Sequence, residues 1–271
     1  MFFIHVDEKT PSDIYAEMTE PLSSLSNIFF LDRHRCTWGG FGHVLATLKG
    51  LGALEDERAE FDYVILLTGQ DYPVKSTADI QGFLRASAGL SYMDYFPLPR
   101  PEWPGNGGLD RLNHWHFYPF GRHMEYPVKS PWRFHQLNLL WNQVIDAIPV
   151  ERSLPNGLRP FGGSSYWCLS RECVEYINQF LCRNTWYVRW FKHTWVSDEL
   201  FFQTILLNSS LKTRLVNNNL RYIQWSRGSP SPDVLSAMDF DNLARTDKLF
   251  ARKFDGTIAP KILDLIDQQL L

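Results

Sequence analysis

At 271 residues, the chain is long enough to form one large α/β domain with a substantial hydrophobic core. Its 27 basic and 30 acidic residues leave a formal net charge of -3, which gives no bulk electrostatic reason to expect binding to nucleic acid or to an anionic membrane. We therefore predict no nucleic-acid partner.

The first residues lack the basic region, the apolar core and the cleavage site of a secretory signal peptide. The chain also has no apolar run of about 18 residues, the length that a transmembrane helix requires. We expect a cytoplasmic protein without a signal peptide or a transmembrane helix. Peripheral association with the inner face of the membrane stays open.

The cysteine and aromatic contents bear on the kind of site. The cysteines form no Cys-x-x-Cys pair and have no histidine spacing typical of a zinc site, so we expect them to be reduced and mostly buried. They are Cys36, Cys168, Cys173 and Cys182. Aromatic residues make up 15% of the chain, with ten Trp. Such a surplus is typical of sites for sugar rings, but it is equally consistent with a Trp-rich core.

The chain opens with a predicted buried strand, FFIHV, which leads into a polar turn at Asp7. In α/β nucleotide folds, a carboxylate at the carboxyl end of a strand lies at the rim of the nucleotide crevice. A helix over residues 14–25 and a second strand, NIFFL, complete a βαβ pattern. Because only Met1 precedes the first strand, we expect the fold to lack the first strand and helix of a doubly wound domain.

The following segments alternate between apolar periodicity and polar turns. Helical spacing over residues 42–54 leads to the strand and turn YVILLTGQDYPV. Residues 90–133 are rich in Pro, Gly, His and aromatics, and such long loops are usually functional or mobile. Helical periodicity returns over residues 134–147.

The last third of the chain has a similar alternation. FGGSSYWCLS predicts a turn and a strand, and RECVEYINQFL predicts a helix. Ser197 is a favoured N-cap residue for a helix over VSDELFFQTIL. RYIQW predicts a strand, and the segment with Lys248, Arg252 and Lys253 predicts a helix.

Several of these segments, taken together and in order, resemble the glycosyltransferase family 14 enzymes. That family comprises the core-2 and I-branching β-1,6-N-acetylglucosaminyltransferases and the peptide O-xylosyltransferases. The matching stretches are FIHVDEK, WGGFGHVLATLKGL, YVILLTGQDYPVKS, FGGSSYWCLSRECVEYI, VSDELFFQTIL and the tail from LRYIQW to LFARKFD. The bacterial members are the most similar.

The resemblance implies an α/β fold of the GT-A type with a central, mostly parallel sheet. We expect a single glycosyltransferase domain over residues 1–271, with a donor-binding half over 1–90 and an acceptor-binding and catalytic half over 91–271. The implied activity is inverting transfer of GlcNAc or xylose from a UDP-sugar to a hydroxyl of a glycan or peptide. The UDP-sugar is a substrate, and neither a cofactor nor a divalent metal is expected.

Sugar transfer needs a base for the acceptor hydroxyl and positive charge for the departing diphosphate. The resemblance assigns Glu199, in the VSDEL motif, as the base, although a glutamate that complements a helix dipole is the ordinary alternative. It assigns Lys253 to the diphosphate. Arg227 and Arg252 are further candidates, and a solvated helix face and a turn arginine are the alternatives for these cations.

The same resemblance indicates the other substrate contacts. Asp7 corresponds to an aspartate on the uridine side of the donor, with a turn-capping role as its alternative. Trp38, Gly69, Gln70 and Asp71 are the remaining donor-side candidates, although glycines serve ordinary turns equally well. The acceptor-side candidates are Glu125, Trp132, Ser164 and Ser165.

Two motifs indicate metal chemistry instead. An Asp-x-Asp pair, Asp239 and Asp241, is typical of metal-dependent transferases, but it precedes a helical stretch and we interpret it as helix-capping. His114 and His116 form a His-x-His motif that favours a metal-dependent hydrolase as an alternative function. A non-catalytic carbohydrate-binding protein is the third hypothesis.

Overall fold

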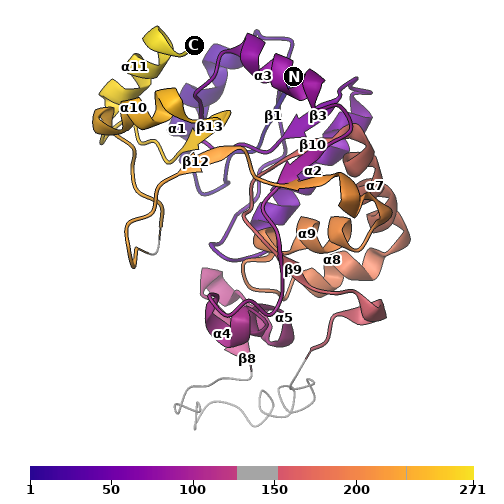
Figure 1. Cartoon of the computed structure of the whole chain (residues 1–271). Helices are drawn as coiled ribbons and strands as arrows, with labels where there is room; N and C mark the ends of the chain where they lie inside the picture. Colours follow the sequence, from indigo (N-terminus) through magenta and orange to yellow (C-terminus); the bar gives the residue numbers. More distant parts are fainter. Residues whose placement is uncertain (127–151, 230) are drawn as a thin grey trace. The chain divides into compact units, whose positions relative to one another are not determined.

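The computed structural model describes residues 1–126, 152–229 and 231–271 (Figure 1). These residues form two compact units, and each unit draws on three separate stretches of the chain. Unit 1 comprises Met1–Glu60, Phe96–Ser165 and Tyr176–Ser210, and unit 2 comprises Phe61–Tyr95, Tyr166–Glu175 and Leu211–Leu271. The expected single transferase domain with two functional halves stays a prediction. The predicted helix over residues 134–147 lies outside the described residues.

Unit 1 combines short strands with the longest described helix, α2. Its strands are β1 (Phe2–Ile4), β2 (Ile28–Phe30), β6 (Phe96–Pro97), β7 (Trp115–Phe117), β8 (Met124–Tyr126) and β9 (Phe161–Gly162). Its helices are α1 (Ser12–Thr19), α2 (Gly42–Asp56), α4 (Pro104–Gly107), α5 (Asp110–Asn113), α8 (Thr185–Phe191) and α9 (Phe201–Leu207). Short 3-10 turns are η1 (Glu20–Leu22), η2 (Pro119–Gly121), η3 (Pro155–Gly157) and η4 (Ser197–Glu199).

Unit 2 holds the two larger sheets. Its strands are β3 (Tyr63–Ile65), β4 (Tyr72–Pro73), β5 (Ser91–Met93), β10 (Trp167–Ser170), β11 (Leu215–Asn217), β12 (Arg221–Ile223) and β13 (Phe250–Arg252). Its helices are α3 (Thr77–Ala86), α10 (Phe240–Arg245) and α11 (Pro260–Gln269), with the 3-10 turn η6 (Ala237–Asp239). Helix α7 (Arg171–Arg183) and the turn η5 (Ser210–Arg214) have residues in both units.

The predicted βαβ pattern at the start of the chain is confirmed. β1 and β2 pair in parallel with Phe3 opposite Phe29, and α1 lies between them in sequence. The two phenylalanine rings stack with centroids 5.0 Å apart. A short parallel pair therefore places the polar residues that follow both strands at one end of the pair.

The α/β class is confirmed, but the direction of the strands differs from the prediction. The four-stranded sheet has the order β11-β5-β10-β3, and β10 runs antiparallel to both of its neighbours. Only β11 and β5 pair in parallel in this sheet. The reason is the connection: β10 follows a long excursion of the chain instead of one helical crossover, so it can enter between β5 and β3 in the opposite direction. The sheet is therefore mixed.

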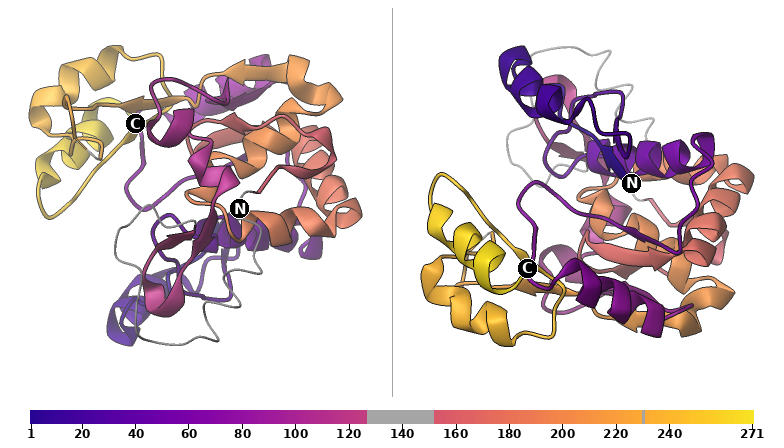
Figure 2. Two further views of the ribbon diagram at one scale, coloured as in Figure 1. Left: turned by 90° about the horizontal axis from the view of Figure 1, so that it is seen from below. Right: turned by 90° about the horizontal axis from the view of Figure 1, so that it is seen from above.

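The predicted helix over the basic C-terminal segment is wrong. Phe250, Ala251 and Arg252 form β13, the central strand of the sheet β12-β13-β4. All three residues are buried, because a central strand is covered on both faces and needs no polar alternation. Helices α10 and α11 pack beside this sheet through a cluster of Val74, Leu243, Ala251 and Ile262 (Figure 2).

The core explains part of the aromatic surplus. In unit 1, the fully buried rings of Tyr187, Phe191 and Phe201 contact one another, and the Tyr187 hydroxyl donates to the Phe201 carbonyl. In unit 2, Trp167 is 1% exposed. Trp38 and Trp225, in contrast, are 72% and 57% exposed. The core interpretation of the aromatic content is therefore confirmed for the buried rings, and the sugar-site interpretation stays a prediction for the exposed ones.

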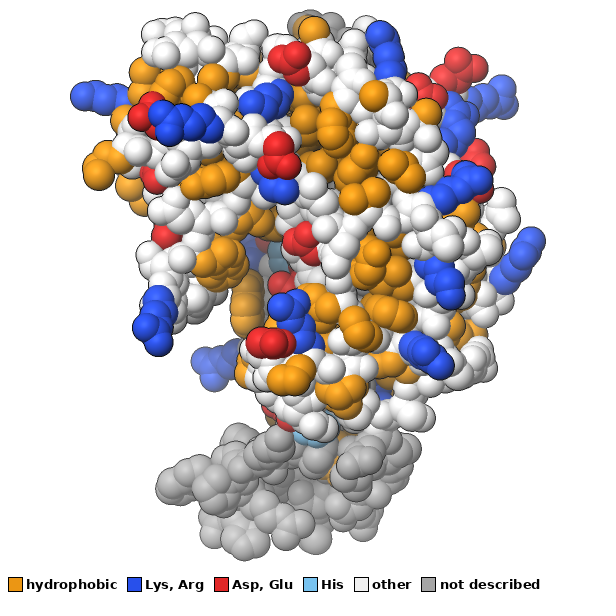
Figure 3. Space-filling model, viewed as in Figure 1, with side chains coloured by type: hydrophobic (Ala, Val, Ile, Leu, Met, Phe, Trp, Pro, Cys, Tyr) orange, Lys and Arg blue, Asp and Glu red, His pale blue; other side chains and the backbone are white. Residues whose placement is uncertain are grey.

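The surface agrees with the nearly balanced charge. On the face seen in Figure 3, Lys and Arg side chains are scattered among Asp and Glu side chains. Among the described residues, no helix combines the length and the apolar character that crossing a bilayer requires.

Gly39 is the position where the backbone of unit 1 depends most clearly on glycine. Its φ is +72°, and a Cβ there would lie 2.7 Å from Trp195 Nε1. We expect Gly39→Ala to destabilise the protein by about 1–3 kcal/mol, because the side chain adds both backbone strain and a clash. The measurement is the free energy of unfolding in urea.

Gly52 provides the matched control for this substitution. It lies inside α2, and a Cβ there meets nothing within 4 Å. Gly52→Ala should stabilise the protein by about 0.5–1 kcal/mol through the better helix propensity of alanine. Equal effects of the two substitutions would contradict the role given to Gly39.

Candidate functional site

Glu199 lies at the end of the turn η4, where a distorted backbone holds it. Val196, which precedes the turn, has a φ of +50°, and its carbonyl accepts from the Glu199 N–H at 3.1 Å. The Glu199 carbonyl accepts from the Gly163 N–H at 2.9 Å. The predicted helix start at Ser197 is wrong, because the Ser197 side chain is buried and α9 begins only at Phe201. The backbone of Glu199 is thus fixed by one contact within its own turn and one to a segment distant in sequence.

A single arginine neutralises the Glu199 carboxylate. Arg111, on α5, donates from Nη1 to Glu199 Oε2 at 2.6 Å. The Arg111 side chain is 11% exposed and that of Glu199 is 30% exposed. The guanidinium also lies 3.8 Å from the ring centroid of Trp103, which adds a cation–π contact. Arg111 was not among the sequence candidates, and its only signal was a cation in an aromatic-rich stretch.

The environment changes the acidity of Glu199. Burial raises the pKa of this carboxyl, and the charge of Asp198 raises it further, while Arg111 lowers it. The net direction is upward. A carboxylate with a raised pKa is a stronger base than an exposed glutamate, and the contact with Arg111 favours its ionised form.

Trp38 and Gly39 adjoin the turn that carries Glu199. The Gly39 carbonyl accepts from the Val196 N–H at 2.7 Å and from the Tyr118 hydroxyl at 2.6 Å. Trp38 packs edge-on against Trp195, with ring centroids 6.0 Å apart. The exposed Trp38 ring therefore lies next to the backbone that positions the carboxylate.

The serines predicted on the acceptor side belong to the same neighbourhood. Ser165 donates from its hydroxyl to Asp198 Oδ2 at 2.6 Å. The Ser164 carbonyl accepts from Nε2 of the fully buried Gln203 at 2.7 Å. The segments FGGSS and VSDEL, which are far apart in sequence, are thus joined directly.

Asp7 has a local role in the turn after β1. Its carboxylate accepts from the Lys9 N–H at 2.9 Å and lies 3.3 Å from Lys9 Nζ. A further contact at 3.4 Å joins it to the Cys36 N–H. Burial raises the pKa of Asp7, but the bonds and charge of Lys9 outweigh this effect, so the pKa is lowered. The carboxylate is therefore ionised at neutral pH.

Glu125 and the His-x-His motif form two separate pairs on the hairpin of β7 and β8. His114 contacts the Glu125 carboxylate, and His116 Nδ1 lies 2.9 Å from His123 Nε2. Burial lowers the pKa of His116 to about 4. Within the part of the chain that the structure describes, these residues do not form a group of three metal-ligating atoms within 4.8 Å of one another. The geometry of these residues gives the hydrolase hypothesis no support. Trp132 lies outside the described residues.

In unit 2, Asp71 and Arg252 form a buried ion pair. Arg252 Nη1 lies 3.4 Å from Asp71 Oδ1, and the exposed fractions of the two side chains are 9% and 0%. The Thr68 N–H donates to Asp71 Oδ2 at 2.6 Å, and Arg252 lies over the Tyr166 ring at 4.3 Å. Burial lowers the pKa of Arg252, and Asp71 opposes this change. These two donor-side candidates bind each other.

The remaining donor-side candidates of unit 2 lie at the ends of the same strands. The Gln70 carbonyl accepts from the Phe254 N–H at 3.0 Å, which brings the turn at Gly69 beside the residues that follow β13. Lys253 follows β13 directly and is partly exposed, and its carbonyl accepts from Leu235. Arg227 is exposed in a turn after β12. Unit 2 thus joins TGQDYP to the basic C-terminal segment.

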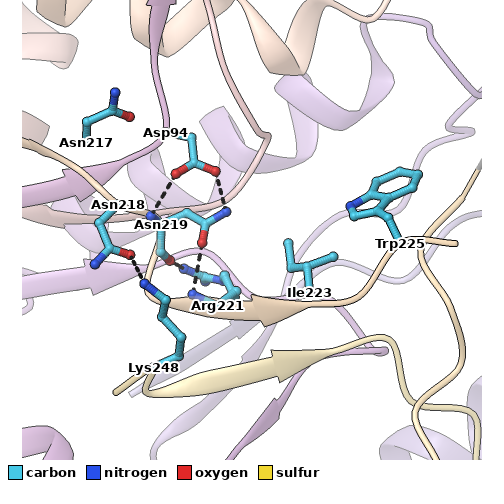
Figure 4. Close-up of a pocket in the computed structure, with 8 residues that line it drawn as sticks. All are labelled: Asp94, Asn217, Asn218, Asn219, Arg221, Ile223, Trp225 and Lys248. Carbon is cyan, nitrogen blue, oxygen red and sulfur yellow. Dashed lines mark hydrogen bonds between the residues drawn. The ribbon is translucent and has the colours of Figure 1, made fainter. Parts of the chain in front are cut away.

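A polar pocket of about 390 Å³ also lies in unit 2 (Figure 4). Asp94 accepts from the Asn219 side chain at 2.6 Å, and Lys248 donates to Asn218 Oδ1 at 3.1 Å. Beyond these pairs, Ile223 and Trp225 extend the wall along the chain that continues from β12 (Figure 4). Amide, carboxylate and ammonium groups beside an exposed indole suit a ligand with hydroxyls and a flat apolar face.

The Asp-x-Asp motif caps a helix, as predicted. Asp239 accepts from the Ser236 N–H at 2.8 Å, and the Ser236 hydroxyl accepts from the Met238 N–H at 3.3 Å. This reciprocal arrangement is a capping box at the start of η6.

The Arg111–Glu199 contact predicts a titration that can be measured directly. Because its pKa is raised in the folded protein, Glu199 should take up a proton at a higher pH than an ordinary glutamate does. Arg111→Gln removes the opposing charge, so it should raise the pKa of Glu199 further. The measurement is the carboxyl carbon shift of Glu199 in an NMR titration.

Arg100→Gln is the control for this titration. Arg100 is an exposed arginine of the same unit that pairs with Glu102 at 3.0 Å. This substitution should leave the pKa of Glu199 unchanged. A Glu199 carboxyl that titrates identically in the wild type and in Arg111→Gln would refute the electrostatic role of Arg111.

The Asp71–Arg252 pair predicts a large effect on stability. Asp71→Asn leaves the Arg252 guanidinium buried without its counterion, which should cost about 3–5 kcal/mol in the free energy of unfolding. The double substitution Asp71→Asn with Arg252→Met removes the buried charge and should recover much of that loss. Chemical denaturation measures both. If Asp71→Asn is as stable as the wild type, water already solvates the Arg252 guanidinium and the ion pair does not stabilise the fold.

A family model described as Core-2/I-Branching enzyme matches residues 1–243. Xylosyltransferase 2 of Rattus norvegicus and of Homo sapiens are each 27% identical to this chain over 288 residues, which is 99% of the chain. Xylosyltransferase oxt of Drosophila melanogaster is 27% identical over 293 residues. The chain spans about 30% of the length of these curated relatives.

Proposed function

Because the chain belongs to the Core-2/I-Branching enzyme family, we propose that it is a glycosyltransferase that moves a sugar from a UDP-sugar donor to a hydroxyl of a glycan or peptide. The observation that supports this most is the state of Glu199, a half-buried carboxylate with a raised pKa in the VSDEL motif. Such a group can accept the proton of an alcohol at neutral pH.

In the proposed reaction, Glu199 takes the proton of the acceptor hydroxyl while the hydroxyl oxygen forms a bond to the anomeric carbon of the donor sugar. The bond from that carbon to the diphosphate oxygen breaks, and its electron pair leaves with UDP. Attack from the face opposite the leaving group inverts the anomeric centre. Arg111 acts as a positioning residue that orients the carboxylate.

The developing charge on UDP requires cations, and we propose that side chains of this protein supply them without a divalent metal. Lys253 is the principal candidate, because it is partly exposed immediately after β13. Arg227, in an exposed turn, is the second. Arg252 is already engaged by Asp71, so its contribution would be to shape this region through that pair.

We propose the identity of the donor sugar from the names of the similar proteins. Proteins named xylosyltransferases are among those similar to this chain, which makes xylose the first donor to test and GlcNAc the second. The exposed Trp38 ring beside the Glu199 turn suits one face of a sugar. Association with a membrane surface stays a prediction from the sequence.

Replacement of Glu199 tests the assigned chemistry. Glu199→Gln keeps the shape of the side chain but removes the proton acceptor, so turnover should fall by about 10²–10⁴-fold while UDP affinity stays nearly unchanged. UDP release from UDP-xylose and UDP-GlcNAc measures turnover. Glu102→Gln, at an exposed glutamate of the same unit, is the matched control. Retention of most of the turnover in Glu199→Gln would overturn the role of general base.

Replacement of Lys253 tests the neutralisation of the diphosphate. Lys253→Ala should weaken UDP binding by about 10-fold or more in buffer with EDTA, since a charge-assisted contact contributes about 1.5–3 kcal/mol. Lys261→Ala, at an exposed lysine on α11, should bind UDP as the wild type does. Loss of UDP binding on addition of EDTA alone would instead indicate a metal-dependent site. Glycan binding with no UDP binding would support the carbohydrate-binding hypothesis.

A further inference from the structure

Three residues that the sequence did not associate converge near the start of unit 1. They are His5, His34 and Cys36, and their ligand atoms all lie within 4.8 Å of one another. His5 follows β1, and the other two follow β2. The parallel pairing of these strands is what brings the three side chains together.

The neighbouring backbone is arranged closely around this group. His5 Nε2 lies 2.9 Å from His34 Nδ1, and His34 Nε2 lies 3.7 Å from Cys36 Sγ. A Cβ on Gly42 would lie 3.2 Å from Cys36 Sγ and 2.9 Å from Cys36 Cα. Glycine at position 42 therefore leaves room for the thiol beside the two imidazoles. Cys36 is 7% exposed, while both histidines are partly exposed.

We propose that His5, His34 and Cys36 form a binding site for a zinc ion. Two imidazoles and one thiolate are a ligand set that zinc prefers, with water or another ligand in the fourth position. In a tetrahedral zinc site, a nitrogen and a sulfur ligand lie about 3.6 Å apart and two nitrogens about 3.3 Å apart. The two short contacts use different nitrogens of His34, and only one of these can bind the ion, so the relevant measure is the 4.8 Å within which one ligand atom from each residue lies. Rotation of the side chains would have to bring these three atoms to the tetrahedral separations.

The chemistry of binding follows from the ligands. The Cys36 thiol gives its proton to solvent and its sulfur donates an electron pair to the ion, while each neutral imidazole donates one lone pair. Binding therefore releases a proton from the thiol. The ion would link the residue after β1 to the segment after β2, two strands of only three residues each. Zinc would thereby stabilise the start of unit 1.

The zinc proposal does not rest on the transferase assignment. The group contains none of the cations assigned to the diphosphate, although the Cys36 N–H contacts the carboxylate of Asp7, a donor-side candidate. Transfer of sugar in EDTA would leave the zinc proposal intact, and zinc binding by a protein without transferase activity would do so as well.

The test is zinc binding to the whole, EDTA-stripped protein. Isothermal titration should give one high-affinity site per chain, with a proton release that changes the apparent heat between buffers of different ionisation enthalpy. Cobalt substitution should produce a thiolate-to-cobalt charge-transfer band and the intense visible bands of a four-coordinate ion. Zinc should also raise the melting temperature.

Variants assign the ligands. Cys36→Ser should abolish the charge-transfer band. Cys36→Ser and His34→Ala should each weaken zinc binding by more than about 10-fold, because even the loss of a group that only supports a ligand costs about 10–100-fold. Cys182→Ser and His43→Ala, at an exposed cysteine and an exposed histidine, are the matched controls and should bind as the wild type does. Circular dichroism in EDTA verifies that each variant is folded. If Cys36→Ser unfolds, His5→Gln carries the test of the ligand set.

The outcomes are decisive. Absence of high-affinity zinc binding in the wild type would overturn the proposal, as would unchanged binding in folded Cys36→Ser and His34→Ala. Loss of binding only in the Cys182→Ser or His43→Ala control would also overturn it, because it would place the ion elsewhere. After any of these results, the contacts among His5, His34 and Cys36 would be hydrogen bonds that only stabilise the fold.

Discussion

A carboxylate that is partly withdrawn from water needs a positive charge or hydrogen-bond donors to offset its lost hydration. For Glu199, the contacts that supply this charge connect distant segments of unit 1. Its counterion, Arg111, comes from a stretch of chain 88 residues earlier. The guanidinium is in turn covered by Trp103. The pair holds the Glu199 carboxylate in one position, because neither partner can move away without leaving an unpaired charge in a low-dielectric environment. The carboxylate nevertheless stays partly exposed to an incoming acceptor. The candidate base is therefore built by tertiary contacts more than by its own helix.

In unit 2, the buried charge of the candidate region is a cation, and its counterion is a carboxylate. Arg252 is held inside by Asp71, whereas Lys253, the next residue, is partly exposed. Strand β13 ends at Arg252 and Lys253 follows it, so the two adjacent basic residues have different environments. One cation helps to hold the fold, and the next remains accessible to a ligand.

Much of the fold was predictable from the sequence, and the failures have physical causes. The short parallel pair and helix α2 were predictable because their apolar patterns are local. The helix predicted around Arg252 failed because a fully buried central strand has no alternation to distinguish it. Candidate site residues could be named from the sequence where motifs carry them, as at Glu199, and their roles stay predictions. Arg111 and the cluster of His5, His34 and Cys36 could not be named in this way. The roles of these residues depend on contacts between segments that are distant in sequence, and only the folded structure shows such contacts.

The interleaved composition of the two units has a consequence for biosynthesis. Unit 1 includes residues up to Ser210, and unit 2 begins at Phe61 but needs the final helix to complete its apolar cluster. Neither unit can therefore close while the ribosome is still producing the middle of the chain. Strand β1 can pair early with β2, but β3 must stay exposed until its partner β10 is synthesised, which is a long interval for aggregation or chaperone capture. Truncation at either end should for the same reason yield insoluble material instead of an isolated folded half.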